Sequence, residues 1–85
     1  MIEELAKAYV DNIPLKSIEN LIKDITITYH TDNTITVDIY LQKSFIIIYL
    51  ELNDVPTFGI NGNYIGDVIS EITNYFKILG FKEIR

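Results

Sequence analysis

Cysteine and tryptophan are absent from this chain of 85 residues, and histidine occurs only once. Without cysteine the chain can form neither a disulfide framework nor a thiolate metal site. The absence fits a reducing compartment, and we expect the protein to be cytoplasmic. A metal site built on His30 with Asp32 and Asp38 would lack a second nitrogen ligand, so we expect no metal and no cofactor.

Basic residues are also scarce, with seven lysines and arginines against twelve aspartates and glutamates and a net charge of −5. Proteins that bind nucleic acid normally concentrate basic side chains on one surface, because phosphate neutralisation supplies much of their affinity. The lysines of this chain are scattered along its length. We therefore expect neither nucleic acid nor an anionic membrane to be its main partner.

Long apolar runs are missing as well. The longest, residues 45–50, has the length of a strand rather than of a membrane span. The first residues, MIEELAKAY, are acidic where a signal peptide would be basic, so we expect no targeting segment. The length predicts a single domain over residues 1–85.

Isoleucine is abundant, with seventeen copies in a chain that is 48% hydrophobic. Its spacing predicts an α+β fold of two layers in the order αβββα: a three-stranded antiparallel meander packed on helices at both ends of the chain. We expect the N-terminal helix to be kinked or broken at Pro14. The expected elements are a helix over 2–12, a second helical piece ending near 23, strands at 25–30, 34–41 and 44–52, and a helix from about 64 to 79.

Side-chain alternation predicts how these strands pair, since a shift of one residue moves every side chain to the other face. A loop with an odd number of residues, such as 31–33, matches apolar with apolar positions, and it would place Asn33 in the left-handed region. A loop with an even number of residues, at 42–43, likewise matches apolar with apolar positions between the second and third strands. The predicted partners are Tyr29 with Ile35, Ile27 with Val37, Ile25 with Ile39, Ile39 with Ile46, Val37 with Ile48 and Ile35 with Leu50.

The same register leaves Tyr40, Phe45, Ile47 and Tyr49 together on the opposite face of the sheet. A solvated face would normally carry polar residues at these positions, and a contiguous apolar patch usually marks a contact site. Three interpretations remain. A helix or the C-terminal tail, with Phe81 and Ile84, covers the patch; two copies of the chain, or another protein, meet through this face or the edge of the third strand; or the aromatic rings stack on nucleic-acid bases.

Gly59, Gly62 and Gly66 lie just before the last predicted helix, where a glycine loop can hold a phosphate on backbone N–H groups. The segment lacks a lysine and a Walker-type ending, and Asp67 places a negative charge at the helix start. In the alternative interpretation the three glycines serve only the fold. Residues 61–62 then form a turn with positive φ, Gly66 is a flexible joint, and the helix begins at Asp67.

Two short motifs give the chain a resemblance to a family of short archaeal α/β proteins of unknown function. The first is the helix start with Glu3, Glu4 and Ala8, and the second is the run Lys23-Asp24-Ile25-Thr26-Ile27 that leads into the strands. The resemblance implies a small α/β protein with a housekeeping partner. It implies no catalytic or binding residue.

No serine lies in a nucleophile motif and no carboxylate pair suggests acid–base chemistry, so we expect the protein not to be an enzyme. The sequence predicts a non-catalytic module that binds a protein partner or itself, as a possible homodimer, through Tyr40, Phe45, Ile47 and Tyr49. The alternative is a small anion- or nucleotide-binding protein that uses the glycine loop 59–66. Binding of nucleic acid by the sheet aromatics is a minor alternative.

Overall fold

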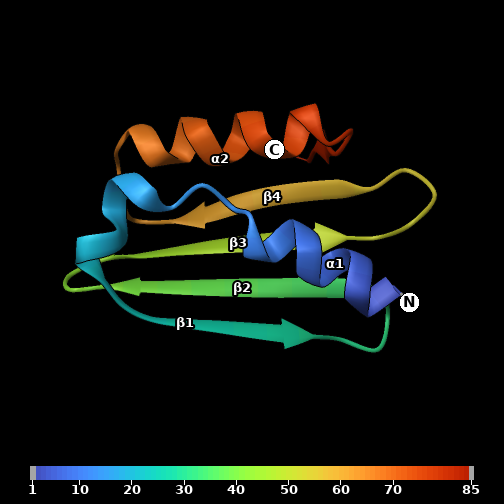
Figure 1. Cartoon of the computed structure of the whole chain (residues 1–85), viewed down its shortest axis with the longest axis horizontal. Coiled ribbons are helices and arrows are strands. Elements are labelled where there is room, and N and C mark those ends of the chain that lie inside the picture. The colour runs from blue at the N-terminus through green and yellow to red at the C-terminus, as the bar shows by residue number, and fades with distance from the viewer. Residues whose placement is uncertain (1, 85) are drawn as a thin grey trace.

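The computed structural model describes residues 2–84, and it describes the side chains of all of these except Ile2, Glu3 and Leu5. The expectations for those three side chains, including the part of the archaeal resemblance that rests on Glu3, lie outside the described structure. The chain forms two layers, a sheet and a set of helices (Figure 1). The elements are α1 (Ile2–Asp11), η1 (Lys16–Leu21), β1 (Ile22–Tyr29), β2 (Thr34–Leu41), β3 (Phe45–Glu51), β4 (Thr57–Gly62), α2 (Asp67–Ile78) and β5 (Lys82–Glu83).

The sheet has five strands in the order β1-β2-β3-β4-β5. Strands β1 to β4 form an antiparallel meander, and β5 pairs in parallel with the first residues of β4. The α+β class and the meander are therefore confirmed, whereas the expected number of three strands is wrong. Strand β4 was missed because two of its six residues are glycine, which is depleted in strands. Strand β5 has only two residues, too few to leave a pattern.

The predicted register is confirmed at every pair. Tyr29, Ile27 and Ile25 of β1 lie opposite Ile35, Val37 and Ile39 of β2. The same β2 residues lie opposite Leu50, Ile48 and Ile46 of β3. The odd loop between β1 and β2 contains Asn33 with φ of 66°, as the turn requires. Burial of one aliphatic face thus determines how β1, β2 and β3 align.

The helical N-terminus is interrupted, as Pro14 predicts. Helix α1 ends at Asp11, and the second piece is a short 3-10 helix that leads directly into β1. Helix α2 begins at Asp67, as the structural interpretation of the glycine segment predicts, so the expected start near residue 64 is wrong. Ile65 precedes the helix and is almost fully exposed. Gly80 follows the helix with φ of 95°, the left-handed conformation that commonly ends a helix.

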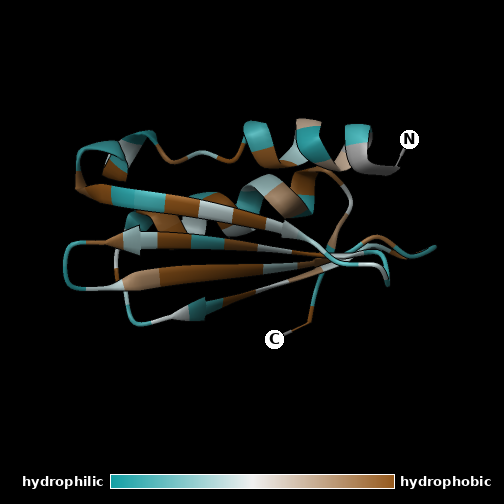
Figure 2. Cartoon of the chain, turned by 90° about the horizontal axis from the view of Figure 1, so that it is seen from below, coloured by the Kyte–Doolittle hydropathy of each residue, from teal (hydrophilic) through white to brown (hydrophobic). Residues whose placement is uncertain are grey.

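The core lies between the helices and one face of the sheet (Figure 2). Helix α2 contributes Val68, Ile72 and Phe76, whose four-residue spacing places them on one side of the helix. The Phe76 ring packs against Phe58 of β4 and Phe81 of the tail at centroid distances of 5.3 Å. The Tyr75 hydroxyl donates to the backbone carbonyl of Tyr9 and so links α2 to α1. Burial, helped by the nearby Tyr9, raises the pKa of Tyr75.

Among the described residues, none of the helices has the length and apolar character needed to cross a bilayer.

Gly62 gives a direct test of how β4 joins the sheet. Its φ is +134°, and an added Cβ would lie 2.3 Å from the carbonyl oxygen of Phe45. Because this atom belongs to the backbone of β3, Gly62→Ala should lower the free energy of unfolding by about 3 kcal/mol or more. Gly80→Ala is the control, since its φ is also positive but nothing lies within 4 Å, and it should cost about 1 kcal/mol. Urea denaturation measures both, and equal losses would contradict this account.

Candidate functional site

Both helices lie on the same side of the sheet, so the opposite side, here called the open face, has no helix over it (Figure 2). Four apolar side chains of β2 and β3 project from this face, and we call them the aromatic patch: Tyr40, Phe45, Ile47 and Tyr49. Tyr40 lies directly opposite Phe45, while Ile47 and Tyr49 follow at alternate positions along β3. The strand register therefore brings together all four residues that the sequence singles out.

The aromatic patch is accessible to solvent. Tyr40 and Tyr49 are 45% and 44% exposed, and Phe45 and Ile47 are partly exposed. The tail residues that the structure describes, up to Ile84, do not cover the patch, because Phe81 is buried against Tyr9 and Phe76 on the helix side. The apolar residues of β2 and β3 on the helix side are, in contrast, almost completely buried.

A hollow of about 360 Å³ adjoins the patch, and Gly59 forms its floor. Gly59 lies opposite Tyr49 in the sheet, and an added Cβ would be 3.8 Å from the Ile84 side chain. The missing side chain leaves the space between the Tyr49 ring and Ile84 unfilled. The open face thus has a raised aromatic part and a depression beside it.

The charged side chains of β2 and β3 on the open face are the acids Asp38 and Glu51. Ile47 lies directly opposite Asp38, so a carboxylate borders the middle of the patch. Thr36 lies opposite Tyr49, and Thr28 follows it on β1. The face therefore changes from apolar and aromatic over β3 to polar and threonine-rich over β1.

The edge of β3 is not available as a contact site. Strand β3 pairs with β2 on one side and with β4 on the other. The expectation that partners meet through the edge of the third strand is therefore wrong, since β4 occupies that edge. Strand β1, which pairs only with β2 among the described strands, forms a free edge of the sheet.

The three glycines do not form one loop. Gly59 and Gly62 lie within β4, and only residues 63–66 connect β4 to α2. Gly62 lets the chain pass close to β3, where the Asn63 side chain accepts the Phe45 N–H at 2.8 Å. Gly66 precedes α2 with extended backbone, and the ring of Tyr64 lies against it. The expectation of a continuous glycine loop over 59–66 is therefore wrong.

His30 and its neighbouring acid are engaged in local hydrogen bonds. The imidazole Nε2 lies 2.9 Å from the Thr36 hydroxyl, and the Thr34 hydroxyl donates to Asp32. This hydrogen bond is the main reason why the pKa of Asp32 is lowered. Among the residues that the structure describes, no three histidine, aspartate or glutamate side chains converge on a point where a metal ion would be held.

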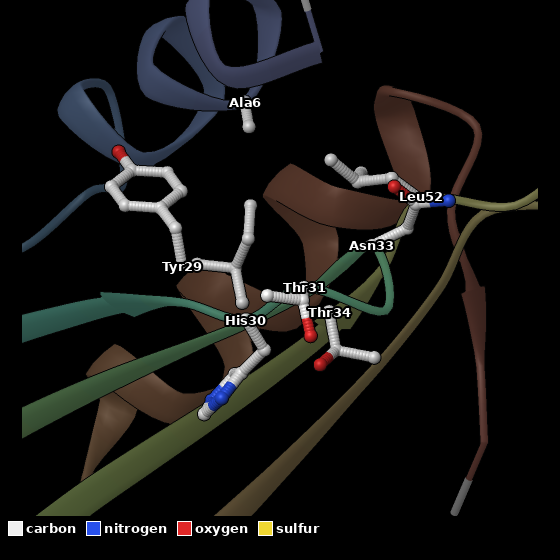
Figure 3. Close-up of a pocket in the computed structure, with 8 residues that line it drawn as sticks. Ala6, Tyr29, His30, Thr31, Asn33, Thr34 and Leu52 are labelled. Carbon is white, nitrogen blue, oxygen red and sulfur yellow. The ribbon is translucent and has the colours of Figure 1, made fainter.

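A second hollow, of about 310 Å³, lies under α1 beside the loop between β1 and β2 (Figure 3). Ala6, Tyr29, Ile35 and Leu52 give it apolar walls, and the loop residues form its rim. Tyr29 projects toward α1, whereas the His30 ring points away from the helix (Figure 3). The hollow thus has no convergent set of polar groups that would suggest catalysis.

Sequence reasoning missed Gly59 as part of the open face, and it considered Ile84 only as part of a tail that covers the patch. Their place depends on β4 and β5, neither of which it identified. The available signal was the alternation in 57-TFGING-62, where Phe58 and Ile60 are apolar and their neighbours are small or polar. The glycines obscured that signal because they also suggested a loop.

No protein-family model, no curated protein and no solved structure matches this chain. The resemblance to short archaeal proteins therefore stays a prediction.

The exposure of the patch predicts that its residues contribute little to stability. Tyr49→Ala should lower the free energy of unfolding by about 1 kcal/mol or less, because the ring is only half buried and loses few contacts. Phe58→Ala is the matched aromatic control on the other face of the sheet, where it is fully buried, and it should cost about 3–5 kcal/mol. Chemical denaturation of both variants checks this difference. A loss at Tyr49 as large as that at Phe58 would show that the ring serves the fold.

Proposed function

We propose that this protein is a non-catalytic interaction module that binds a partner protein on the open face of its sheet. The observation that carries the proposal is the aromatic patch, which stays partly exposed on a face without helices while the apolar residues of the opposite face are buried. Aromatic side chains are enriched at the centres of protein interfaces, because they bury much area with little loss of conformational freedom. The patch has this composition, with three aromatic rings among its four residues.

The hollow above Gly59 supports a protein partner rather than a flat, non-specific contact. Interface hot spots usually combine a large side chain with a pocket on the other partner that receives it. Here Tyr49 can insert into a partner, while the space between Tyr49 and Ile84 can receive a partner side chain. The tyrosine hydroxyls can form hydrogen bonds at the rim of such an interface.

The charges of the open face favour a partner with basic groups near its contact site. Asp38 and Glu51 border the aromatic patch, and the chain as a whole carries a net charge of −5. Complementary charge would speed association, and arginine or lysine could also pack over the aromatic rings. The same acids oppose the minor alternative of nucleic-acid binding, in which phosphates would approach this face.

Anion binding by the glycine segment has less support. Gly59 and Gly62 belong to β4, and the Gly62 position is crowded by the backbone of β3. Asp67 lies in the first turn of α2, where a bound anion would meet a negative charge. We therefore do not adopt this alternative.

Photo-crosslinking in source cells tests the proposed function. With p-benzoylphenylalanine at position 49, we expect one discrete protein adduct, because this position lies at the centre of the proposed contact. At position 78 we expect none, because Ile78 is 85% exposed but lies on α2, away from the open face. The adducts are separated by gel electrophoresis and identified by mass spectrometry.

Two further changes serve as controls for the adduct from position 49. Phe45→Asp should lower its yield by about tenfold or more, as expected for the loss of a central interface residue. Ile65→Asp changes another exposed apolar residue, outside the open face, and should leave the yield unchanged. Circular dichroism verifies that both variants fold. Absence of an adduct from position 49, or the same adduct from position 78, would contradict the proposal.

A further inference from the structure

Strand β1 forms a free edge of the sheet. It pairs with β2 on one side only, whereas at the opposite edge β5 covers the first residues of β4. Figure 1 shows β1 at the lower margin of the sheet, with no other described element beyond it. An eight-residue strand with an unpaired side offers a row of N–H and C=O groups to another strand.

The hydrogen bonds show which residues of β1 present these groups. The His30 N–H donates to the Thr34 carbonyl at 2.9 Å, so at this end the even-numbered residues face β2. In antiparallel pairs, successive residues direct their backbone groups to opposite sides. Ile25, Ile27 and Tyr29 therefore direct theirs to the free edge.

The side chains of these same three residues are incompletely covered. Ile25, Ile27 and Tyr29 are 38%, 37% and 40% exposed, although they lie on the helix side of the sheet. Their partners on β2 are almost fully buried. Helix α1 lies over the middle strands rather than over β1 (Figure 1). Backbone groups without a strand partner and incompletely buried apolar side chains thus occur at the same positions.

Features that normally protect an edge strand occur only at the start of β1. The charged pair Lys23 and Asp24 lies there, together with an irregularity in the pairing between Ile22 and Asp24. The Asp24 carboxylate also accepts the Ile25 N–H at 2.9 Å. From Ile25 to Tyr29 the strand has no charge, no proline and no bulge. This uncharged half is the type of edge that pairs with another strand.

We infer that β1 pairs antiparallel with β1 of a second copy of this chain, in a register centred on Ile27. In this register Ile27 lies opposite Ile27 of the other copy, and Ile25 lies opposite Tyr29. These positions are the ones whose backbone groups face the free edge. On the other face, Thr26 lies opposite Thr28. Every apolar side chain thus meets an apolar one, and every threonine meets a threonine.

The charges at the ends of β1 explain why a second copy fits better than an unrelated strand. The antiparallel register places Asp24 of one copy opposite His30 of the other, and the two-fold symmetry repeats this pair. Lys23 of one copy lies opposite Thr31 of the other, next to Asp32. The Ile25 N–H exchanges its bond to Asp24 for the Tyr29 carbonyl of the second copy, which releases the carboxylate toward His30. The sequence from Asp24 to His30 is therefore complementary to itself in shape and in the placing of its polar groups.

The pairing creates one continuous sheet of ten strands, five from each copy. Because paired residues point to the same side, all helices lie on one side and both open faces on the other. Five strand spacings separate the two β3 strands, which places the aromatic patches about 24 Å apart. The dimer would present both patches to one partner surface.

Sedimentation velocity tests the dimer on the full chain. The wild type should sediment at twice the chain mass of 9.8 kDa, and Ile27→Lys should sediment as a monomer, because it places a charge at the centre of the pairing. Val55→Lys, a charge at an exposed valine outside β1, should remain a dimer. Tyr49→Asp should remain a dimer too, so failure of this inference and failure of the proposed function are distinguishable.

Single cysteines test the register without depending on the folding of Ile27→Lys, since the chain has no other cysteine. Ile27→Cys should form a disulfide-linked dimer under mild oxidation, because the two Cα atoms would lie about 5.5 Å apart. Ile25→Cys is equally exposed but should not form this disulfide, because the two copies of position 25 in the dimer would lie about 13 Å apart along the strands. An equimolar mixture of Ile25→Cys and Tyr29→Cys should form a disulfide-linked heterodimer, because the register places position 25 of one copy opposite position 29 of the other.

Three results would overturn the inference. One is a wild type that sediments as a monomer at millimolar concentration. In that case the edge of β1 either stays unpaired or pairs with a strand of another protein. Another is a dimer that Ile27→Lys leaves intact although the variant is folded. The third is disulfide formation at similar rates in Ile25→Cys and Ile27→Cys, which would indicate random collision.

Discussion

The pairing of β2 with β3 is the constraint on which the rest of this structure depends. It aligns Ile35, Val37 and Ile39 with Leu50, Ile48 and Ile46, so that one face of the central sheet is aliphatic. Burial of that face requires the helices, and α1, η1 and α2 all lie on the same side. A shift by one residue would bury threonine, aspartate and tyrosine instead. The same alternation leaves the aromatic patch on the uncovered face as a direct consequence.

Much of this arrangement could be predicted from the sequence, because the strongest signals are local. Alternation in β1 and β2, together with the parity of the two connecting loops, determined the register, and Asn33 and Pro14 marked the turn and the break in the helical segment. Strand β4 could not be predicted in this way. Its alternation is interrupted by Gly59 and Gly62, and it is stabilised by contacts with β3 and α2 that are distant in sequence. Strand β5 depends wholly on such contacts.

The candidate site was predicted only in part for the same reason. The four residues of the aromatic patch lie on β2 and β3, where parity alone placed them together. Whether the tail covered them depended on the path of the residues after Gly80, whose sequence carries no pattern of secondary structure. The tail instead turns Phe81 into the core and places Ile84 beside Gly59, so it borders the open face without covering it.

The central claim is that the open face of the sheet is accessible in the folded chain while the helix side is not. Photo-CIDNP NMR tests this directly, because it polarises only tyrosine rings that solvent-borne dye can reach. Tyr40 and Tyr49 should be strongly polarised, since both are nearly half exposed, and Tyr75, which bonds to the carbonyl of Tyr9, should not. Protection of Tyr40 and Tyr49 in the isolated chain would contradict the account, because it would mean that the chain itself covers the face.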